Sequence, residues 1–202
     1  MLRELFSGVL VSEPTVHEDT RGTFREWFKA SEFEEATGYP FDLQQANIST
    51  SVKGVFRGLH FADVPPGQAK FVSCLSGRIL DVVVDIREGS PTFKRWEAVE
   101  LSAENKKSLY VPIGFAHGFL ALEDATVAYL TSSEYNPDAE REVSLFDPEI
   151  GIEWPEMEYV LSEKDKKAPL LSDANLPQFE DCQGFETMLR DGWVIANEEA
   201  GS

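Results

Sequence analysis

The sequence contains little cysteine, little histidine and no long apolar run, and each shortage excludes a class of protein. Cys74 and Cys182 are the only cysteines in 202 residues and form no Cys-x-x-Cys motif, so we expect free thiols in a cytoplasmic protein. The three histidines include no His-x-His pair, which argues against a metal site of two histidines and a carboxylate. No apolar run approaches the roughly 20 residues of a membrane span, and the first residues show no signal-peptide pattern.

Basic residues are also scarce. Lys and Arg number 18 against 36 Asp and Glu, which gives a formal net charge of −18. Proteins that bind nucleic acids present basic faces to the phosphate backbone, so we expect no nucleic-acid partner. The acidic residues are scattered, which is typical of a solvated surface. A site for an anionic ligand would therefore have to gather the few basic side chains in one place.

Several catalytic motifs are missing as well. The sequence has no Gly-x-Ser-x-Gly elbow, no Walker phosphate loop and no Gly-x-Gly-x-x-Gly fingerprint. Neither cysteine lies in a glycine-rich or strongly basic context. The sequence therefore contains no motif that would indicate nucleophilic hydrolysis, ATP chemistry or nicotinamide chemistry.

What the sequence does contain is a series of short segments in which apolar and polar residues alternate, separated by Gly, Pro, Asn and Asp. This pattern predicts a mainly β fold, an antiparallel jelly-roll barrel or sandwich with a few short helices, mostly near the C-terminus. We expect one domain over residues 1–180 and a tail of unknown role over 181–202. One or two short edge strands are expected within residues 5–16. The other expected strands cover residues 42–50, 54–61, 70–75, 78–86, 96–101, 108–111, 118–122 and 126–132.

Two helices are expected outside these strands. Ser31 followed by Glu34 fits a capping box, and Gly38 would end that helix. A second short helix is expected over residues 185–194, and residues 197–202 are expected to be frayed.

The residues from Arg57 to Lys70 suggest a chemistry. His60 and Lys70 stand on either side of a Pro65-Pro66-Gly67 turn, which would bring the imidazole and the ammonium towards one cavity. An imidazole accepts a proton near pH 7 and a fixed cation stabilises an oxyanion, a pairing that suits proton abstraction next to a carbonyl. A lone histidine between apolar neighbours is often a packing residue, however, and this stretch alone leaves that alternative open.

Other polar residues are harder to interpret from their surroundings. His117 is flanked by glycines, which let the backbone approach either a ligand or another strand. Glu26 lies on an otherwise aromatic strand face and could simply reach water at a strand edge. Asp81 and Asp85 lie in an expected central strand, where we interpret them as structural.

An ordered set of motifs is more specific than any one of them. The set comprises Arg57-Gly-Leu-His60, Pro66-Gly-Gln-Ala-Lys70, Asp81-Val-Val-Val-Asp-Ile-Arg87, Gly89-Ser-Pro-Thr-Phe93, Gly114-Phe-Ala-His-Gly-Phe119, Tyr129 and Ser162-Glu-Lys-Asp165. Together these resemble the dTDP-4-dehydrorhamnose 3,5-epimerases, sugar-nucleotide enzymes with a cupin-like jelly-roll fold. The resemblance spans roughly residues 1–180.

The resemblance implies an isomerase that needs no metal or organic cofactor. Its substrate would be dTDP-4-dehydro-6-deoxy-D-glucose, whose C4 ketone acidifies the protons at C3 and C5. His60 would be the base, with Asp165 holding its other ring nitrogen. Lys70 would stabilise the enolate oxygen, and Tyr129 would return a proton from the opposite face.

The resemblance also implies substrate contacts and an assembly. Family members are homodimers in which N-terminal strands pair with the partner's sheet and lend part of the site. Basic residues among the contacts would make a locally positive cleft on a negative protein. The implied substrate-binding residues are Arg21, Glu26, Gln45, Asn47, Arg57, His117, Glu140 and Lys164.

Three alternatives stay open. A relative that inverts only C3 or only C5 would use the same base, lysine and tyrosine. A 3,4-ketoisomerase is less favoured, because more histidines are expected around such a site. A non-catalytic cupin-type module that binds a nucleotide sugar or serves in assembly would not need His60, Lys70, Tyr129 and Asp165.

Overall fold

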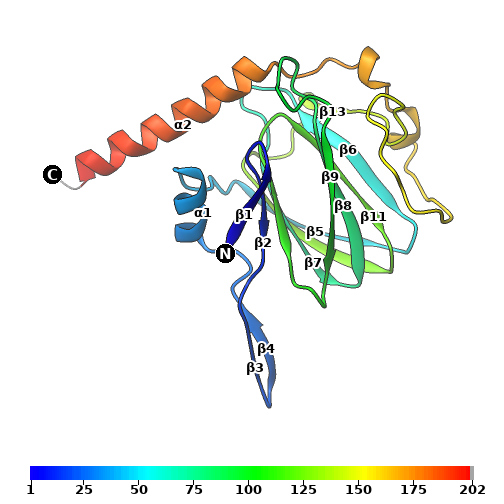
Figure 1. Ribbon diagram of the computed structural model, residues 1–202, viewed down its shortest axis with the longest axis horizontal. Coiled ribbons are helices and arrows are strands. Elements are labelled where there is room, and N and C mark those ends of the chain that lie inside the picture. The colour runs from blue at the N-terminus through cyan, green and yellow to red at the C-terminus, as the bar shows by residue number, and fades with distance from the viewer. Residues whose placement is uncertain (201–202) are drawn as a thin grey trace.

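The computed structural model describes residues 1–200 and shows two antiparallel β-sheets packed face to face, with both α-helices on one side of them (Figure 1). The six-stranded sheet has the order β1-β2-β10-β7-β12-β5, and the five-stranded sheet has the order β13-β6-β11-β8-β9. Strands β3 and β4 form a separate hairpin that projects from the body (Figure 1). The predicted mainly β sandwich is confirmed.

The strands reproduce the predicted series and add to it. Each of the eight expected segments overlaps one strand, and the largest shifts are three residues, at β5, which begins at Gln45 rather than residue 42, and at β11, which begins at Phe115 rather than residue 118. The edge strands expected within residues 5–16 correspond to β1 and β2, and β13 is additional. The strands are β1 (Leu2–Phe6), β2 (Val9–Ser12), β3 (Val16–Asp19), β4 (Gly22–Arg25), β5 (Gln45–Ser51), β6 (Phe56–Ala62), β7 (Lys70–Ser76), β8 (Arg78–Asp85), β9 (Trp96–Ser102), β10 (Ser108–Val111), β11 (Phe115–Ala121), β12 (Ala125–Thr131) and β13 (Glu140–Glu142).

Three hydrophobic clusters hold the layers together. Because strand residues alternate between faces, the inward positions of both sheets form the middle cluster, which includes Val72, Val83 and Val127. The outer face of the five-stranded sheet packs against the segment that follows β13. The outer face of the six-stranded sheet is covered by aromatic residues before and within α1. Each sheet therefore packs on both of its faces.

Helix α1 (Ala30–Thr37) begins one residue earlier than predicted. Its N-cap is Lys29, which makes no side-chain capping bond, so the Ser31 capping box is wrong. Burial of Phe33 accounts for the helix instead, since this ring packs against Tyr110 of the sheet at 4.9 Å between centroids. Gly38 ends the helix with φ of 84°, as expected for a left-handed cap.

Helix α2 (Phe179–Ala200) is much longer than the predicted segment and contains the residues from 197 to 200 that were expected to be frayed. Residues 201 and 202 lie outside the described residues. The helix leads away from the sheets past α1 (Figure 1), where the Trp193 Nε1 donates to Glu34 and the Arg190 Nε donates to the Thr37 carbonyl. It also begins before residue 181, so the expected division at residue 180 falls within a helix. Among the described residues no helix is long and apolar enough to cross a membrane.

A buried ion pair joins the base of α2 to the sandwich. Arg87 is 3% exposed and Asp85 is 0% exposed, and the guanidinium Nη2 donates to the carboxylate at 2.8 Å. The guanidinium also lies over the rings of Phe115 and Phe179, at 4.1 and 5.0 Å from their centroids. Burial alone would raise the pKa of Asp85, but hydrogen bonds from Arg87 and two hydroxyl groups outweigh it and leave the pKa below its usual value.

Candidate active site

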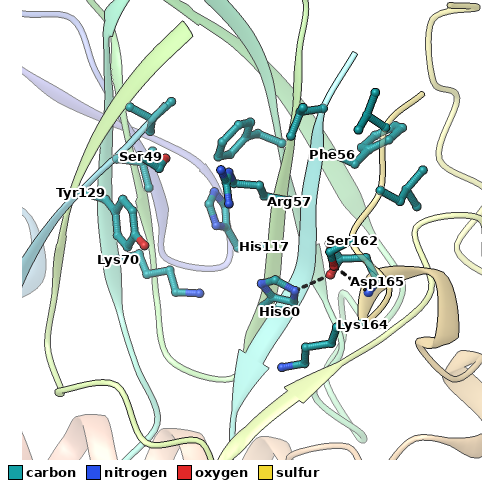
Figure 2. A pocket seen from close by; sticks show the side chains of 16 residues that line it. Ser49, Phe56, Arg57, His60, Lys70, His117, Tyr129, Ser162, Lys164 and Asp165 are labelled. Atoms are coloured by element: carbon teal, nitrogen blue, oxygen red, sulfur yellow. Dashed lines mark hydrogen bonds and ion pairs between the residues drawn. The ribbon is translucent and has the colours of Figure 1, made fainter. Parts of the chain in front are cut away.

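A cavity of about 480 Å³ opens between the two sheets at one end of the sandwich. Figure 2 shows that its side chains converge from both sheets and from the loop that carries Ser162 and Asp165. The six-stranded sheet supplies Lys70 and Tyr129, and the five-stranded sheet supplies His60. A volume of this size is within the range of small-molecule sites.

His60 is held by a carboxylate 105 positions away in the sequence. Its Nε2 lies 2.7 Å from the Asp165 Oδ1, and Ser162 Oγ donates to the Asp165 Oδ2 at 2.8 Å. Ser162 Oγ also accepts from the Asp165 backbone N–H at 3.0 Å, where the single turn Asp165–Lys167 begins. Burial would raise the pKa of Asp165, but the hydrogen bonds from His60 and Ser162 leave it below its usual value. The carboxylate is therefore ionised at neutral pH and fixes the imidazole.

A second imidazole stands beside the first. His117 on β11 is the register partner of His60 on β6, and its Nε2 lies 2.6 Å from the Asp81 Oδ1. The two strands approach closely here because glycines face each other: a Cβ on Gly58 would come within 2.5 Å of the Gly118 Cα. The glycines around His117 thus serve a close strand contact, one of the two uses expected from the sequence.

Lys70 and Tyr129 form the opposite wall of the cavity (Figure 2). Both point inward because β7 and β12 pair in a register that places Lys70 across from Thr131 and Tyr129 across from Val72. Burial lowers the pKa of the Lys70 ammonium, whereas the charges of Glu140 and Asp81 oppose that shift. Burial raises the pKa of Tyr129, so its phenol keeps its proton at neutral pH.

Basic side chains gather around the cavity, although the protein as a whole carries a formal net charge of −18. Arg57 and Lys164 contribute side chains to its wall along with Lys70. The Arg57 Nε donates to Ser51 Oγ at 3.0 Å, and Lys164 pairs with Glu142 at 2.9 Å, so both cations are anchored at the wall. An anionic ligand would be favoured here by charge and by directed donors.

Seven of the twelve side chains predicted for the site line this one cavity, and five do not. Gln45 and Asn47 lie on the neighbouring edge strand β5 and are hydrogen-bonded to each other at 2.7 Å. Glu140 lies on β13, close enough to raise the pKa of Lys70. Arg21 and Glu26 belong to the projecting hairpin and its exit, where Arg21 pairs with Asp19 and both predicted residues are exposed. The seven that line the cavity are Arg57, His60, Lys70, His117, Tyr129, Lys164 and Asp165.

Two features of the site were missed in the sequence. The aspartate partner of His117 was interpreted as structural, because alternation shows which face Asp81 occupies and not what faces it. Tyr135, which lies outside the cavity lining, was not singled out; the residue is 61% exposed and its backbone N–H donates to the Gln45 Oε1 at 2.9 Å. An aromatic residue six positions after Tyr129 was the only signal in the sequence.

No metal centre is apparent in the part of the chain that the structure describes. Residues 1–200 contain no cluster of three or more His, Cys, Asp or Glu side chains suited to hold an ion. Each cavity imidazole is engaged by a carboxylate through its Nε2. The arrangement is suited to moving protons near a polarised carbonyl.

Comparisons with known proteins agree on one family. Residues 4–173 match the family model described as dTDP-4-dehydrorhamnose 3,5-epimerase. The chain is 48% identical over 199 residues to the enzyme of that name from Mycolicibacterium smegmatis, covering 95% of this chain and 98% of the relative. The solved structure of the rmlC epimerase of Mycobacterium tuberculosis superposes with a TM-score of 0.91 at 46% identity, covering 94% of this chain and 100% of that one. A 3'-monoepimerase from Streptomyces bikiniensis, in complex with dTDP-quinovose, superposes with a TM-score of 0.90 at 42% identity, covering 94% and 99%.

Proposed function

Because the chain belongs to the dTDP-4-dehydrorhamnose 3,5-epimerase family, we propose that it converts dTDP-4-dehydro-6-deoxy-D-glucose to dTDP-4-dehydro-L-rhamnose. The chain is thus an isomerase, a carbohydrate epimerase. The observation that carries the proposal is the cavity in which His60, its carboxylate, Lys70 and Tyr129 meet. The location we propose is the cytoplasm, consistent with two free thiols.

The reaction needs a base and an acid on opposite faces of the sugar. The C4 ketone acidifies the C–H bonds at C3 and C5, so His60 removes a proton and the electron pair moves onto the ketone oxygen. Lys70 stabilises the enolate through its positive charge. Tyr129, from the opposite wall, returns a proton to carbon on the other face, which inverts that centre. Tyr129 and His60 then exchange protons with solvent, so no cofactor is consumed.

The nucleotide half of the substrate is matched to the cavity rim. Arg57 and Lys164 supply charge for the diphosphate, and Gln45 and Asn47 offer amide groups beside them on β5. His117 and Glu140 would complete the sugar contacts. The exposed Tyr135 ring, next to Gln45, is suited to stack on the thymine base.

The proposed function is tested by incubating the protein with the 4-keto sugar nucleotide in D₂O. Because each inversion exchanges a carbon-bound proton with solvent, we expect deuterium at both C3 and C5 of the product, detected by NMR and mass spectrometry. Label at one carbon alone would instead identify a single epimerase, the activity of the monoepimerase relative. Absence of label together with tight dTDP binding would favour a non-catalytic nucleotide-sugar module.

We also propose a homodimer in which each hairpin serves its partner's cavity. All eight residues of β3 and β4 are exposed or nearly so, and Phe24 is 65% exposed, which is unusual for a large apolar side chain on a hairpin with no further cover. Arg21 and Glu26 are therefore placed to reach a second copy of the chain rather than their own cavity.

Mixing two inactive variants tests this sharing of sites. We expect Arg21→Ala and His60→Asn each to be nearly inactive alone, and a mixture equilibrated for subunit exchange to regain up to about a quarter of the parent activity. In the mixed dimer one cavity would have both a native His60 and a native Arg21 from the partner. Activity of the mixture no higher than the sum of its components, in a sample shown to be exchanged, would contradict sharing across the interface.

A further inference from the structure

The cavity holds two pairs of histidine and aspartate, and the reaction uses only one of them. His60 with Asp165 forms the base. The second carboxylate, Asp81, has no role in the steps above. It is 0% exposed, its Oδ1 lies 2.6 Å from His117, and its Oδ2 is buried without a hydrogen-bond partner among the described residues.

Burial of this carboxylate with half of its acceptor capacity unused is costly unless a positive charge lies nearby. Removing an ionised group from water costs several kcal/mol, and a single hydrogen bond offsets only a part of that. Lys70 has the opposite deficit, because its partly buried side chain lines the cavity and makes no hydrogen bond or ion pair within residues 1–200. The two side chains face the same space between the sheets: Lys70 shares a face of β7 with Val72, Asp81 shares a face of β8 with Val83, and both valines belong to the middle cluster. His117, which is bonded to Asp81, lines the cavity together with Lys70, so each group is placed to supply the charge that the other lacks.

We propose that Asp81 is a positioning residue for the epimerisation, which keeps the Lys70 amine in its charged form inside the cavity and holds the His117 ring beside it. The inference rests on the proposed function, because the charge of Lys70 matters only if an enolate forms. A neutral amine would stabilise that enolate far less, so loss of the Asp81 charge would narrow the pH range of activity at its alkaline side.

Other charged groups also face Lys70 and must be separated from Asp81. The first of these is Glu140, whose charge opposes the effect of burial on the pKa of Lys70 more than the charge of Asp81 does. Glu140 lies on β13 and is partly exposed, so salt screens it, whereas Asp81 is fully buried and is screened much less. The remaining titratable or charged groups that share the cavity are Arg57, His60, His117, Tyr129, Lys164 and Asp165.

The test is the substitution Asp81→Asn, which removes the charge while the amide can still bond to His117. In protein labelled with ¹³C-lysine, the Cε signal of Lys70, assigned by its absence in Lys70→Arg, is titrated directly and without substrate. We expect its midpoint to fall by about one pH unit relative to the parent. The pH at which kcat/KM declines on the alkaline side should also fall by about one pH unit. At pH values above that decline, kcat/KM should be about tenfold lower than in the parent.

A matched control lies on the same strand. Asp85→Asn removes an equally buried carboxylate four residues along β8, roughly 13 Å away by strand geometry. We expect Asp85→Asn to lower the melting temperature without moving the Lys70 titration. In the parent protein, raising the salt concentration should screen the partly exposed Glu140 and leave most of the contribution of the buried Asp81. The midpoint should therefore fall towards that of Glu140→Gln, and should stay above that of the double variant Glu140→Gln with Asp81→Asn.

Two results would overturn the proposal. One is a Lys70 midpoint in Asp81→Asn equal to that of the parent. The other is a Lys70 midpoint in the double variant Glu140→Gln with Asp81→Asn that equals the midpoint in Glu140→Gln alone, since the partly exposed carboxylate would then account for the charge. Failure of the overall function is distinguishable, because the NMR titration is read in the absence of substrate and turnover.

Discussion

Replacing His60 with Asn is expected to reduce kcat by about 10²–10⁴-fold, the range that a positioned general base contributes. The amide of Asn fills the same space but accepts no proton from carbon at neutral pH. The Asp165 carboxylate, which lies 2.7 Å from the Nε2, cannot take over, because its side chain is only 5% exposed against 29% for His60 and is held in place by Ser162. Solvent deuterium should therefore enter neither C3 nor C5.

The measurement has an internal control for folding. His60→Asn should bind dTDP with parental affinity, because the diphosphate contacts lie on other side chains. Asp165→Asn should retain part of the activity, since the imidazole stays in the cavity but loses the partner that orients it. Label that still appears at one carbon in His60→Asn would show that a different base serves that carbon.

Replacing Arg87 with Met is expected to lower the free energy of unfolding by about 3–5 kcal/mol, the cost of leaving a buried charge without its partner. Asp85 would keep its hydroxyl donors from Ser90 and Thr92 but lose the guanidinium, in a position that is 0% exposed. For a chain of this size such a loss corresponds to a decrease of roughly 6–20 °C in melting temperature, measured by thermal unfolding.

Arg78→Met, at the first residue of β8, is the matched control. Arg78 pairs with Glu100 and Glu123, but these side chains are about half exposed, so we expect a change of at most about 1 kcal/mol. The double variant Arg87→Met with Asp85→Asn should recover part of the loss, because no buried charge is left unpaired. Equal effects of Arg78→Met and Arg87→Met would contradict the assignment of the pair as a core element.

The pH dependence of this pair has a definite sign. Because the pKa of Asp85 is lower in the folded state than in the unfolded chain, its ionised form stabilises the fold above the unfolded pKa of about 4. That contribution is lost as the pH falls through the folded pKa. The difference between parent and Arg87→Met should therefore be constant near neutral pH and shrink in acid.

The strands were predictable because their evidence is local. Alternation of apolar and polar residues, interrupted by turn residues, directly encodes a half-buried sheet. Helix α2 was underestimated because Gly184 and Gly192 interrupt it and its charged residues are numerous. The first turn of the helix packs against Arg87, about 90 residues earlier in the sequence. A contact with such a distant residue cannot be predicted from the residues of the helix alone.

The site was predictable in two different ways. The pairing of His60 with Lys70 came from one stretch of chain and elementary acid-base chemistry. The link from His60 to Asp165 spans 105 positions, so only the resemblance to a known family could supply it, and the structure brings the two together. The hairpin residues Arg21 and Glu26 stay predictions, because a single chain does not bring them to its own cavity.

The direction of α2 indicates where a tag or support can be attached to the protein. The helix leads away from both sheets (Figure 1), and none of its residues lines the cavity. A peptide tag or a solid support coupled to the carboxyl-terminal end would stand clear of incoming sugar nucleotide, so immobilised preparations for deoxysugar synthesis are best attached there. The amino terminus, where Met1 pairs with Glu32 of α1, offers no comparable distance from the folded body.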